Sequence, residues 1–263
     1  MSLRTLLILG VFLIPAIILV ATGEVRFGLN WRTADRSSAG IAPLPQEIPE
    51  ALVQLYAARA FSWRGLFGVH TWIAIKEKQA DHYVVLQVVG WRSWRGLPVV
   101  VVQEDVPDRL WFAARPTLLN QLCGPKAERA IPKILAAAQS YPHPDTYRLF
   151  PGPNSNTFIA HILRQVPELP LNLPATAIGK DYLPEGALMA APSTKGGMQF
   201  SLLGLAGIAW GPELGVEVHF MGISLGLTHH PPGIRLPFFG QLGQAPSYCQ
   251  PKRSAEKVTI NPG

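Results

Sequence analysis

Two short stretches of the chain carry the side chains of a hydrolase-like site. Ser155 lies in residues 151–158, directly before an amphipathic segment, so its hydroxyl is expected at the start of a helix. His70 lies near the start of the apolar segment 69–75. A neutral imidazole can take the proton of a serine hydroxyl, and backbone N–H groups at a helix start can stabilise the resulting oxyanion. Gln87, in the strand expected to pair with that of His70, is the candidate that orients the ring.

The same residues also have ordinary structural interpretations. Asn, Ser and Thr are the usual residues that cap a helix start, and a histidine at a strand end is more often a hydrogen-bonded structural residue than a base. If the site is real, four further residues are expected to contact a substrate: Asn154, Asn156, Thr157 and Trp72. The sequence leaves both interpretations of Ser155 open.

Composition narrows the class of protein. Of the 263 residues, 48% are hydrophobic and 15% are charged, which excludes disorder of the whole chain. The net charge is +6, but the basic residues are scattered among aromatic residues and do not form a run, so we expect no nucleic-acid partner. We also expect no cofactor and no metal, because His229 and His230 are adjacent, no carboxylate lies near them in sequence, and no Gly-rich phosphate loop is present. In residues 91–95, Trp and Arg alternate, which favours contact with lipid headgroups or packing on the domain.

The N-terminus predicts a membrane anchor. Residues 6–21 form an unbroken apolar run, and the uncharged stretch between Arg4 and Glu24 would extend about 28 Å as a helix. We expect an uncleaved transmembrane helix over residues 1–23, with a cleaved signal peptide as the alternative. The expected localisation is the inner membrane with a single span, and the main domain lies on the extracytoplasmic, periplasmic side.

The rest of the chain divides by its periodicity. Residues 24–50 look like a tether, 51–183 an α+β core, 184–243 a β-rich extension and 244–263 an irregular tail. Strands are predicted at residues 52–59, 69–76, 83–91 and 99–102, and helices at 126–140 and 156–166. In the extension, glycine-punctuated apolar segments at 198–210, 215–227 and 234–239 predict strands, and the echo between 202–205 and 220–223 fits two arms of one hairpin. Cys123 and Cys249 are interpreted as two unrelated thiols, with a bridge as the alternative.

The order of the candidate residues resembles a known arrangement. A His on one strand, a polar residue on the next, and then Asn-nucleophile-x-x-Phe at a helix start is similar to the circularly permuted papain-like families, which include the NlpC/P60 peptidases and lecithin retinol acyltransferase. Their pattern is Asn-Cys-x-x-Phe, whereas residues 154–158 read Asn-Ser-Asn-Thr-Phe. The resemblance implies an antiparallel sheet with packed helices, with Ser155 as nucleophile, His70 as base and Gln87 as the orienting residue. Ser155 then depends on its base more than a thiol would.

A second resemblance covers more of the chain. Residues 31–36, 70–72, 89–92, 151–158 and 177–182 resemble a bacterial family of membrane-anchored proteins that carry a domain of unknown function. This second resemblance brings no activity with it. From the candidate site and the papain-like resemblance we expect a hydrolase or acyltransferase that acts on an amide or ester of a cell-envelope peptide or lipid. The alternative is a non-catalytic envelope protein that binds lipid or a protein partner through the same cleft or through the apolar extension.

Overall fold

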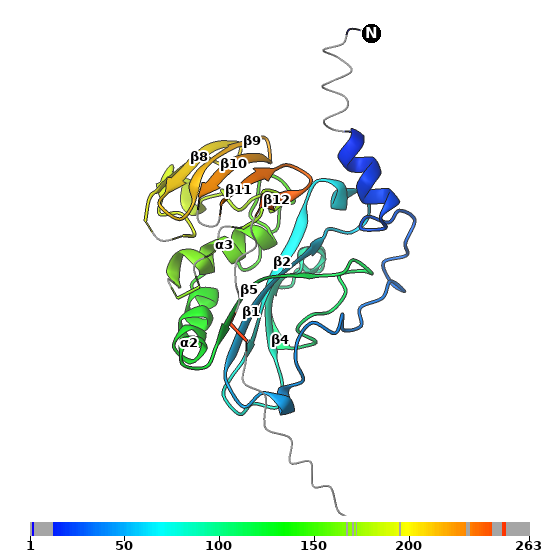
Figure 1. Cartoon of the computed structure of the whole chain (residues 1–263), viewed down its shortest axis with the longest axis vertical. Helices are drawn as coiled ribbons and strands as arrows, with labels where there is room; N and C mark the ends of the chain where they lie inside the picture. Colours follow the sequence, from blue (N-terminus) through cyan, green and yellow to red (C-terminus); the bar gives the residue numbers. More distant parts are fainter. Residues whose placement is uncertain are drawn as a thin grey trace, which may run out of the picture.

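The chain folds into two antiparallel sheets and two long helices. The computed structural model describes residues 2, 13–166, 168–169, 171, 173–194, 196–229, 232–243 and 249–250. Both helices pack on one side of a five-stranded sheet, and a seven-stranded sheet lies beyond helix α3 (Figure 1). The predicted α+β class with an antiparallel sheet is confirmed.

The five-stranded sheet carries the candidate histidine. Its strand order is β4-β3-β2-β1-β5, with antiparallel neighbours throughout. The strands are β1 (Leu52–Arg59), β2 (Val69–Lys76), β3 (Val84–Val88), β4 (Val100–Glu104) and β5 (Thr117–Cys123). β1 and β2 have the predicted bounds: β2 is rich in β-branched and aromatic residues, and β1 is a mostly apolar run. β5 was not predicted, since polar residues at its centre, Asn120 and Gln121, interrupt the hydrophobic pattern.

Short 3-10 turns connect these elements. They are η1 (Pro45–Glu47), η2 (Ser62–Leu66), η3 (Gly90–Arg95) and η4 (Pro184–Gly186). η2 joins β1 to β2, and η3 follows β3. Both turns therefore lie near the strands that hold His70 and Gln87.

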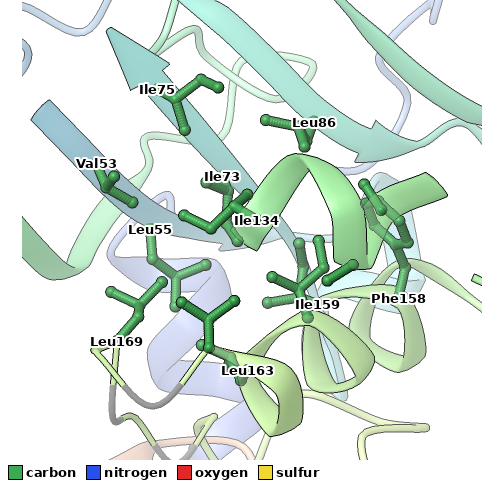
Figure 2. Close-up of a cluster of buried hydrophobic side chains, with 14 of the residues drawn as sticks. Val53, Leu55, Ile73, Ile75, Leu86, Ile134, Phe158, Ile159, Leu163 and Leu169 are labelled. Atoms are coloured by element: carbon green, nitrogen blue, oxygen red, sulfur yellow. The ribbon is translucent and has the colours of Figure 1, made fainter. Parts of the chain in front are cut away.

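The two helices cover one face of this sheet. They are α2 (Pro125–Gln139) and α3 (Ser155–Gln165), within one residue of the predicted bounds, and α2 continues through Pro132. Figure 2 shows the core between sheet and helices, built from Val53, Leu55, Ile73, Leu86, Ile134, Phe158 and Ile159 among others. Burial of each such side chain contributes roughly 1.5–3 kcal/mol, so this core fixes where α3 begins.

The β-rich extension contains more strands than predicted. It is a seven-stranded sheet in the order β12-β11-β10-β9-β8-β7-β6. The strands are β6 (Met189–Ala190), β7 (Met198–Leu202), β8 (Ala206–Gly211), β9 (Gly215–Phe220), β10 (Ile223–His229), β11 (Pro232–Leu236) and β12 (Gly240–Gly243). Each long apolar segment is itself a hairpin. The sequence echo was misinterpreted, because 202–205 and 220–223 are equivalent turns of two hairpins rather than two paired arms.

This second sheet has an inverted polarity. Along β7 and β9 the burial alternates, and the buried side chains are polar while the exposed ones are apolar. The buried polar residues of the sheet are Gln199, Ser201, Glu217, His219, Ser224, Thr228 and Arg235. The inward face is therefore the polar one.

A buried polar layer attaches this face to the rest of the domain. The Glu217 carboxylate pairs with the Lys180 ammonium and, at 3.0 Å, with the Arg235 guanidinium. Arg164 of α3 donates to the backbone oxygen of Lys180 (3.0 Å) and to Oε1 of Gln199 on β7 (3.1 Å). The ammonium of Lys180 is therefore buried against Glu217.

The N-terminal region packs beside the second sheet. Residues 13–21 are helical, and Leu19 contacts Val25 and Phe238, the latter in the β11–β12 turn. Within the described ranges, no helix has the length and hydropathy that crossing a bilayer requires. The predicted anchor includes residues 3–12, which lie outside the described residues. Part of the tether packs on the domain, since the Asp108 carboxylate accepts hydrogen bonds from Ser38 and from the backbone N–H of Ala42.

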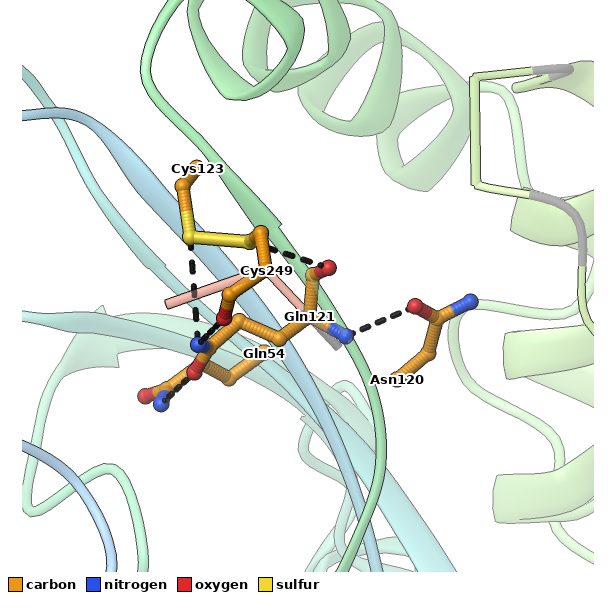
Figure 3. Close-up of a disulfide and its surroundings, with 5 residues drawn as sticks. All are labelled: Gln54, Asn120, Gln121, Cys123 and Cys249. Atoms are coloured by element: carbon orange, nitrogen blue, oxygen red, sulfur yellow. Dashed lines mark hydrogen bonds between the residues drawn. A yellow bond between two sulfur atoms is a disulfide. The ribbon is translucent and has the colours of Figure 1, made fainter. Parts of the chain in front are cut away.

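A disulfide closes the far end of the five-stranded sheet. Cys123, the last residue of β5, is bonded to Cys249, which lies 126 positions further along the sequence, and the two Cα atoms are 6.1 Å apart (Figure 3). Nε2 of Gln121 donates to the backbone oxygen of Cys249 (2.7 Å), and Nε2 of Gln54 donates to Oε1 of Gln121 (2.6 Å). The interpretation of two unrelated thiols is therefore wrong; spacing alone gave no information on their geometry. The other residues of the predicted tail, apart from Gln250, lie outside the described ranges.

We expect the bridge to stabilise the fold. Replacement of Cys249 by Ser should lower the free energy of unfolding by roughly 2–5 kcal/mol, because a long loop of the unfolded chain is no longer closed. The measurement is denaturant unfolding of the native protein, of each single Cys→Ser variant and of the double variant. All three variants should lose the same amount, and a double variant as stable as the native protein would contradict the bridge.

Candidate functional site

Helix α3 begins in a dense network of hydrogen bonds. Asn154 is the N-cap: its Oδ1 accepts from the backbone N–H groups of Asn156 (2.9 Å) and Thr157 (3.2 Å). The Thr157 hydroxyl in turn accepts from the backbone N–H of Asn154 and donates to the backbone oxygen of Gly179 (2.7 Å). Asn154 and Thr157 thus form a reciprocal capping box, which satisfies free donors of the helix start.

Asn156 attaches this helix start to the sheet. Its Nδ2 donates to the backbone oxygens of Val69 on β2 (3.1 Å) and Ile178 (2.8 Å). Its Oδ1 accepts from the hydroxyl of Thr71 (2.9 Å). Gly179 has φ +89°, and a Cβ there would lie 2.4 Å from Nδ2 of Asn154, so only glycine fits this approach. The polar side chains predicted to contact substrate therefore make extensive bonds within the protein.

Ser155 differs from these neighbours. It is the first residue of α3 and is 6% exposed. Its hydroxyl makes no hydrogen bond within the described part of the chain, whereas Asn154, Asn156 and Thr157 make several. It also lines a cavity. The hydroxyl is thus the group at this helix start that remains free to bind or to react.

His70 and Gln87 come together as the sequence predicted. Nε2 of His70 lies 3.2 Å from Oε1 of Gln87, which favours the tautomer with a proton on Nε2 and leaves Nδ1 as the acceptor. The ring stacks on Trp111, with centroids 3.6 Å apart, and on Trp72 at 5.6 Å. Burial lowers the pKa of His70 to about 4, and the hydrogen bond to Gln87 opposes this shift. The imidazole is therefore neutral at pH 7.

One cavity of about 770 Å³ receives both candidate groups. His70 and Ser155 line it, together with Asn154 and Asn156. Aromatic side chains form much of its wall, including Phe61, Trp63, Phe67, Trp91, Trp111 and Phe150. Arg64 and Arg95 also line it, and none of the described residues in its wall carries a carboxylate. Its volume is in the range of small-molecule sites, which are commonly about 300–1,000 Å³ and mostly apolar.

The strand alternation places the two candidates on different sides of the sheet. Thr71 faces α3, since it bonds to Asn156, so the adjacent His70 points to the other face, where Trp72 and Trp111 lie. Within the described residues, no hydrogen bond joins Ser155 to His70. The cavity reaches both because it extends around the end of β2, where Val69 and His70 both line it. Trp72 itself is buried behind His70 and is not part of the cavity wall.

The sequence analysis missed most of the aromatic wall. Trp111 and Phe112 follow β4, and Phe61 to Phe67 form the connection around η2. The signal was available: these stretches are rich in aromatic residues but lie between the strands, and exposed aromatic side chains on loops often serve binding. For residues 91–95 the sequence favoured contact with lipid headgroups or packing on the domain. In the structure, Trp91, Trp94 and Arg95 of this segment line the cavity.

Comparison with known proteins identifies a family without a known activity. Residues 50–182 match a family described as "Protein of unknown function (DUF3750)". This span contains the five-stranded sheet, α2, α3 and the residues His70, Gln87 and Ser155; the seven-stranded sheet lies beyond it. No curated protein and no solved structure matches the chain.

Burial of His70 predicts a loss of stability in acid. Its pKa is lowered in the folded state, so the unfolded chain binds more protons between the unfolded value near 6.5 and the folded value of about 4. The contribution of the neutral His70 ring to the free energy of unfolding is fully present above pH 6.5. It is lost as the pH falls to 4, a change on the order of 3 kcal/mol. We expect the midpoint of thermal unfolding to fall less across this window in His70→Gln than in the native protein.

The matched control is His82, an exposed histidine. A hydrogen bond from its ring to the Asp81 carboxylate raises the pKa of His82, so His82→Gln should not flatten the acid dependence. Identical pH profiles for His70→Gln and the native protein would contradict a neutral buried imidazole at position 70.

Proposed function

The chain belongs to the DUF3750 family, and on that premise we propose that its cavity binds the apolar chain of a membrane amphiphile. The observation that carries the proposal is the cavity of about 770 Å³ with aromatic walls and few polar groups. An extended apolar chain suits such walls, because its transfer from water is favourable along its whole length. The free hydroxyl of Ser155 and the neutral ring of His70 offer polar contacts to the head of the ligand.

The charges at the cavity favour an anionic head. Arg64 is half-buried and Arg95 is exposed, and both line the cavity. A guanidinium binds carboxylate and phosphate oxygens in a bidentate manner. We therefore propose a ligand class of fatty acids and acidic phospholipids, with the acyl chain against the tryptophans.

Three features support a position at a membrane and outside the cytoplasm. Residues 6–21 are apolar in sequence, and in the described helix 13–21 Leu13, Ile14 and Ile17 are more than half exposed. The disulfide between Cys123 and Cys249 is typical of oxidising compartments. We propose a single-span protein of the inner membrane whose main domain is periplasmic.

The binding proposal is tested with a photoreactive lipid. The full chain is placed in lipid nanodiscs that contain a phosphatidic acid with a diazirine on its acyl chain. After illumination, mass spectrometry should find adducts in the cavity-wall peptides around 61–70, 90–95 and 111–112. Trp91→Ala should reduce these adducts severalfold, because an aromatic wall residue worth about 1 kcal/mol or more is removed. The matched control is Val102→Ala, which shortens an exposed apolar side chain on β4 outside the cavity wall. Absence of adducts in all three peptides would refute the proposal.

A second candidate function is hydrolysis or acyl transfer, favoured by the free hydroxyl of Ser155 at the start of α3. We propose the permuted papain-like arrangement, with Ser155 in the usual cysteine position, His70 as base and Gln87 as orienting residue. Oγ of Ser155 would attack the carbonyl carbon of an ester or amide while Nδ1 of His70 takes its proton. That proton would pass to the leaving alcohol or amine, and water or an acceptor would release the acyl group.

This chemistry requires a movement that binding does not require. His70 is held against Trp111 and Gln87 on the side of the sheet opposite α3. A proton transfer needs a separation of about 2.6–3.2 Å between hydroxyl and ring, either directly or through one water. For this reason ligand binding is our first proposal and catalysis the second.

A fluorophosphonate probe tests the catalytic proposal. We expect labelling of the native chain and its loss in Ser155→Ala and His70→Ala, since the hydroxyl reacts only when a base removes its proton. Gln87→Ala should slow labelling by about tenfold or more because the ring loses its orientation. Ser140→Ala, which removes an exposed serine at the end of α2, is the control. Labelling that persists in Ser155→Ala, or no labelling of folded native protein, excludes this function but leaves the binding proposal intact.

A further inference from the structure

The outward side of the seven-stranded sheet is apolar without interruption. We define its outer face by two rows of residues that the strand registers place side by side. The first row is Met198, Trp210, Val216, Leu227, Ile234 and Leu242. The second row is Phe200, Ile208, Val218 and Leu225. The first row crosses six strands, roughly 24 Å at the usual spacing between strands.

These side chains face away from the protein. In the first row the exposed fraction ranges from 37% for Met198 to 64% for Leu227. Among the described strand residues that are exposed on this sheet, none carries a charge, and the indole N–H of Trp210 is the one side-chain N–H or O–H donor. Soluble monomers rarely expose a contiguous apolar surface larger than a few hundred Å², so a surface of this kind marks a contact with a partner or a membrane.

The ion pairs and hydrogen bonds of the polar face require that this face, and not the apolar face, packs against the rest of the protein. The buried side chains of Glu217, Arg235 and Gln199 have their partners on Lys180, Leu214 and Arg164. Reversal of the sheet would bring these charges into contact with solvent and leave Lys180 buried without a carboxylate, which is costly. The apolar side therefore faces outward as a consequence of the ion pairs.

We infer that the outer face docks on one leaflet of a phospholipid bilayer, with its side chains inserted among the lipids. The occupant follows from what lies beside the sheet. Phe238, in the turn between β11 and β12, packs against Leu19 of the exposed helix 13–21, and the sequence before that helix is apolar back to Leu6. In Figure 1 this helix and the sheet lie at the same end of the molecule. A chain segment that enters a bilayer there brings the outer face to its surface.

The sheet suits surface insertion rather than a span. Its backbone groups are paired across the ladders, but among the described residues β12 and β6 are edge strands that no further strand covers, and open edges do not occur within the hydrocarbon. Apolar side chains that reach about 5–10 Å into the boundary between headgroups and acyl chains avoid this cost. Trp210, Phe200 and Phe220 add the aromatic side chains that this boundary favours. The absence of charge on the outer face predicts binding to zwitterionic as well as anionic lipid.

The outer face also continues to the mouth of the cavity. Met221, Gly222 and Ile223, in the turn between β9 and β10 and at the start of β10, line the cavity. Phe220 and Ile223 are paired at the same end of the sheet, and both are exposed. Docking would therefore place the cavity mouth at the lipid surface. The docking inference does not depend on what the cavity binds.

A pair of labelled variants tests the inference in the full chain. Val218 on β9 is 49% exposed, and Val102 on β4 of the other sheet is 44% exposed. Each is replaced by cysteine, which is the single reactive thiol because Cys123 and Cys249 are bonded, and is labelled with the fluorophore NBD. The proteins are placed in phosphatidylcholine vesicles. We expect doxyl-labelled lipid to quench the label at 218 at least severalfold more than the label at 102, and aqueous iodide to show the reverse order.

Two results would overturn the inference. In the first, iodide quenches the label at 218 as strongly as the label at 102. In the second, neither quencher reaches the label at 218, and the protein reconstituted in lipid nanodiscs contains two copies of the chain per disc. The second result would indicate a dimer that forms through the outer face. A second set of variants guards against a local effect of the label. With NBD at Leu225→Cys, the pair of changes Val218→Lys and Ile234→Lys should raise iodide quenching severalfold, whereas Val102→Lys should leave it unchanged.

Discussion

A buried carboxylate, Glu217 on β9, attaches the seven-stranded sheet to Lys180 in the segment that follows α3. Burial alone would raise its pKa, but the charges of Lys180 and Arg235 lower it to about 2, so it remains ionised at neutral pH. Loss of one partner of such a buried pair commonly costs roughly 3–5 kcal/mol, because the other charge is left uncompensated. Lys180 follows the turn that accepts the Asn154 and Asn156 hydrogen bonds, so the ion pair and the start of α3 depend on the same short segment.

This constraint decides which side of the seven-stranded sheet faces outward. Since the inner face of the second sheet must satisfy charges, its apolar residues are left on the outside, and the turn at Gly222 closes over the cavity. A Cβ on Gly222 would lie 3.2 Å from side-chain atoms of Ile178 and Phe150, so this turn is in close contact with the segment that carries the hydrogen bonds of α3. The cavity therefore has one wall from each sheet.

Local patterns predicted the fold better than the site. The bounds of β1 and β2 followed from short apolar runs, and the start of α3 followed from the capping residues at 154–157, because these signals act over a few residues. The pairing of His70 with Gln87 followed from adjacent strands. By contrast, the disulfide, the burial of Lys180 and the place of Trp111 depend on contacts between distant segments. The inverted sheet was partly visible in the alternation of residues 216–220, but only its ion pairs reveal which side is buried.

The charge pairing also argues that the family-matched span and the second sheet form one unit. The match ends at Tyr182, so Lys180 lies inside it, whereas Glu217 and Arg235 lie beyond it. Residues 50–182 alone would keep the ammonium of Lys180 without its carboxylate and would lose the Gln199 contact of Arg164. They would also lose the cavity wall at Met221 and Phe238. The β-rich extension thus completes both the electrostatics of the core and the enclosure of the site.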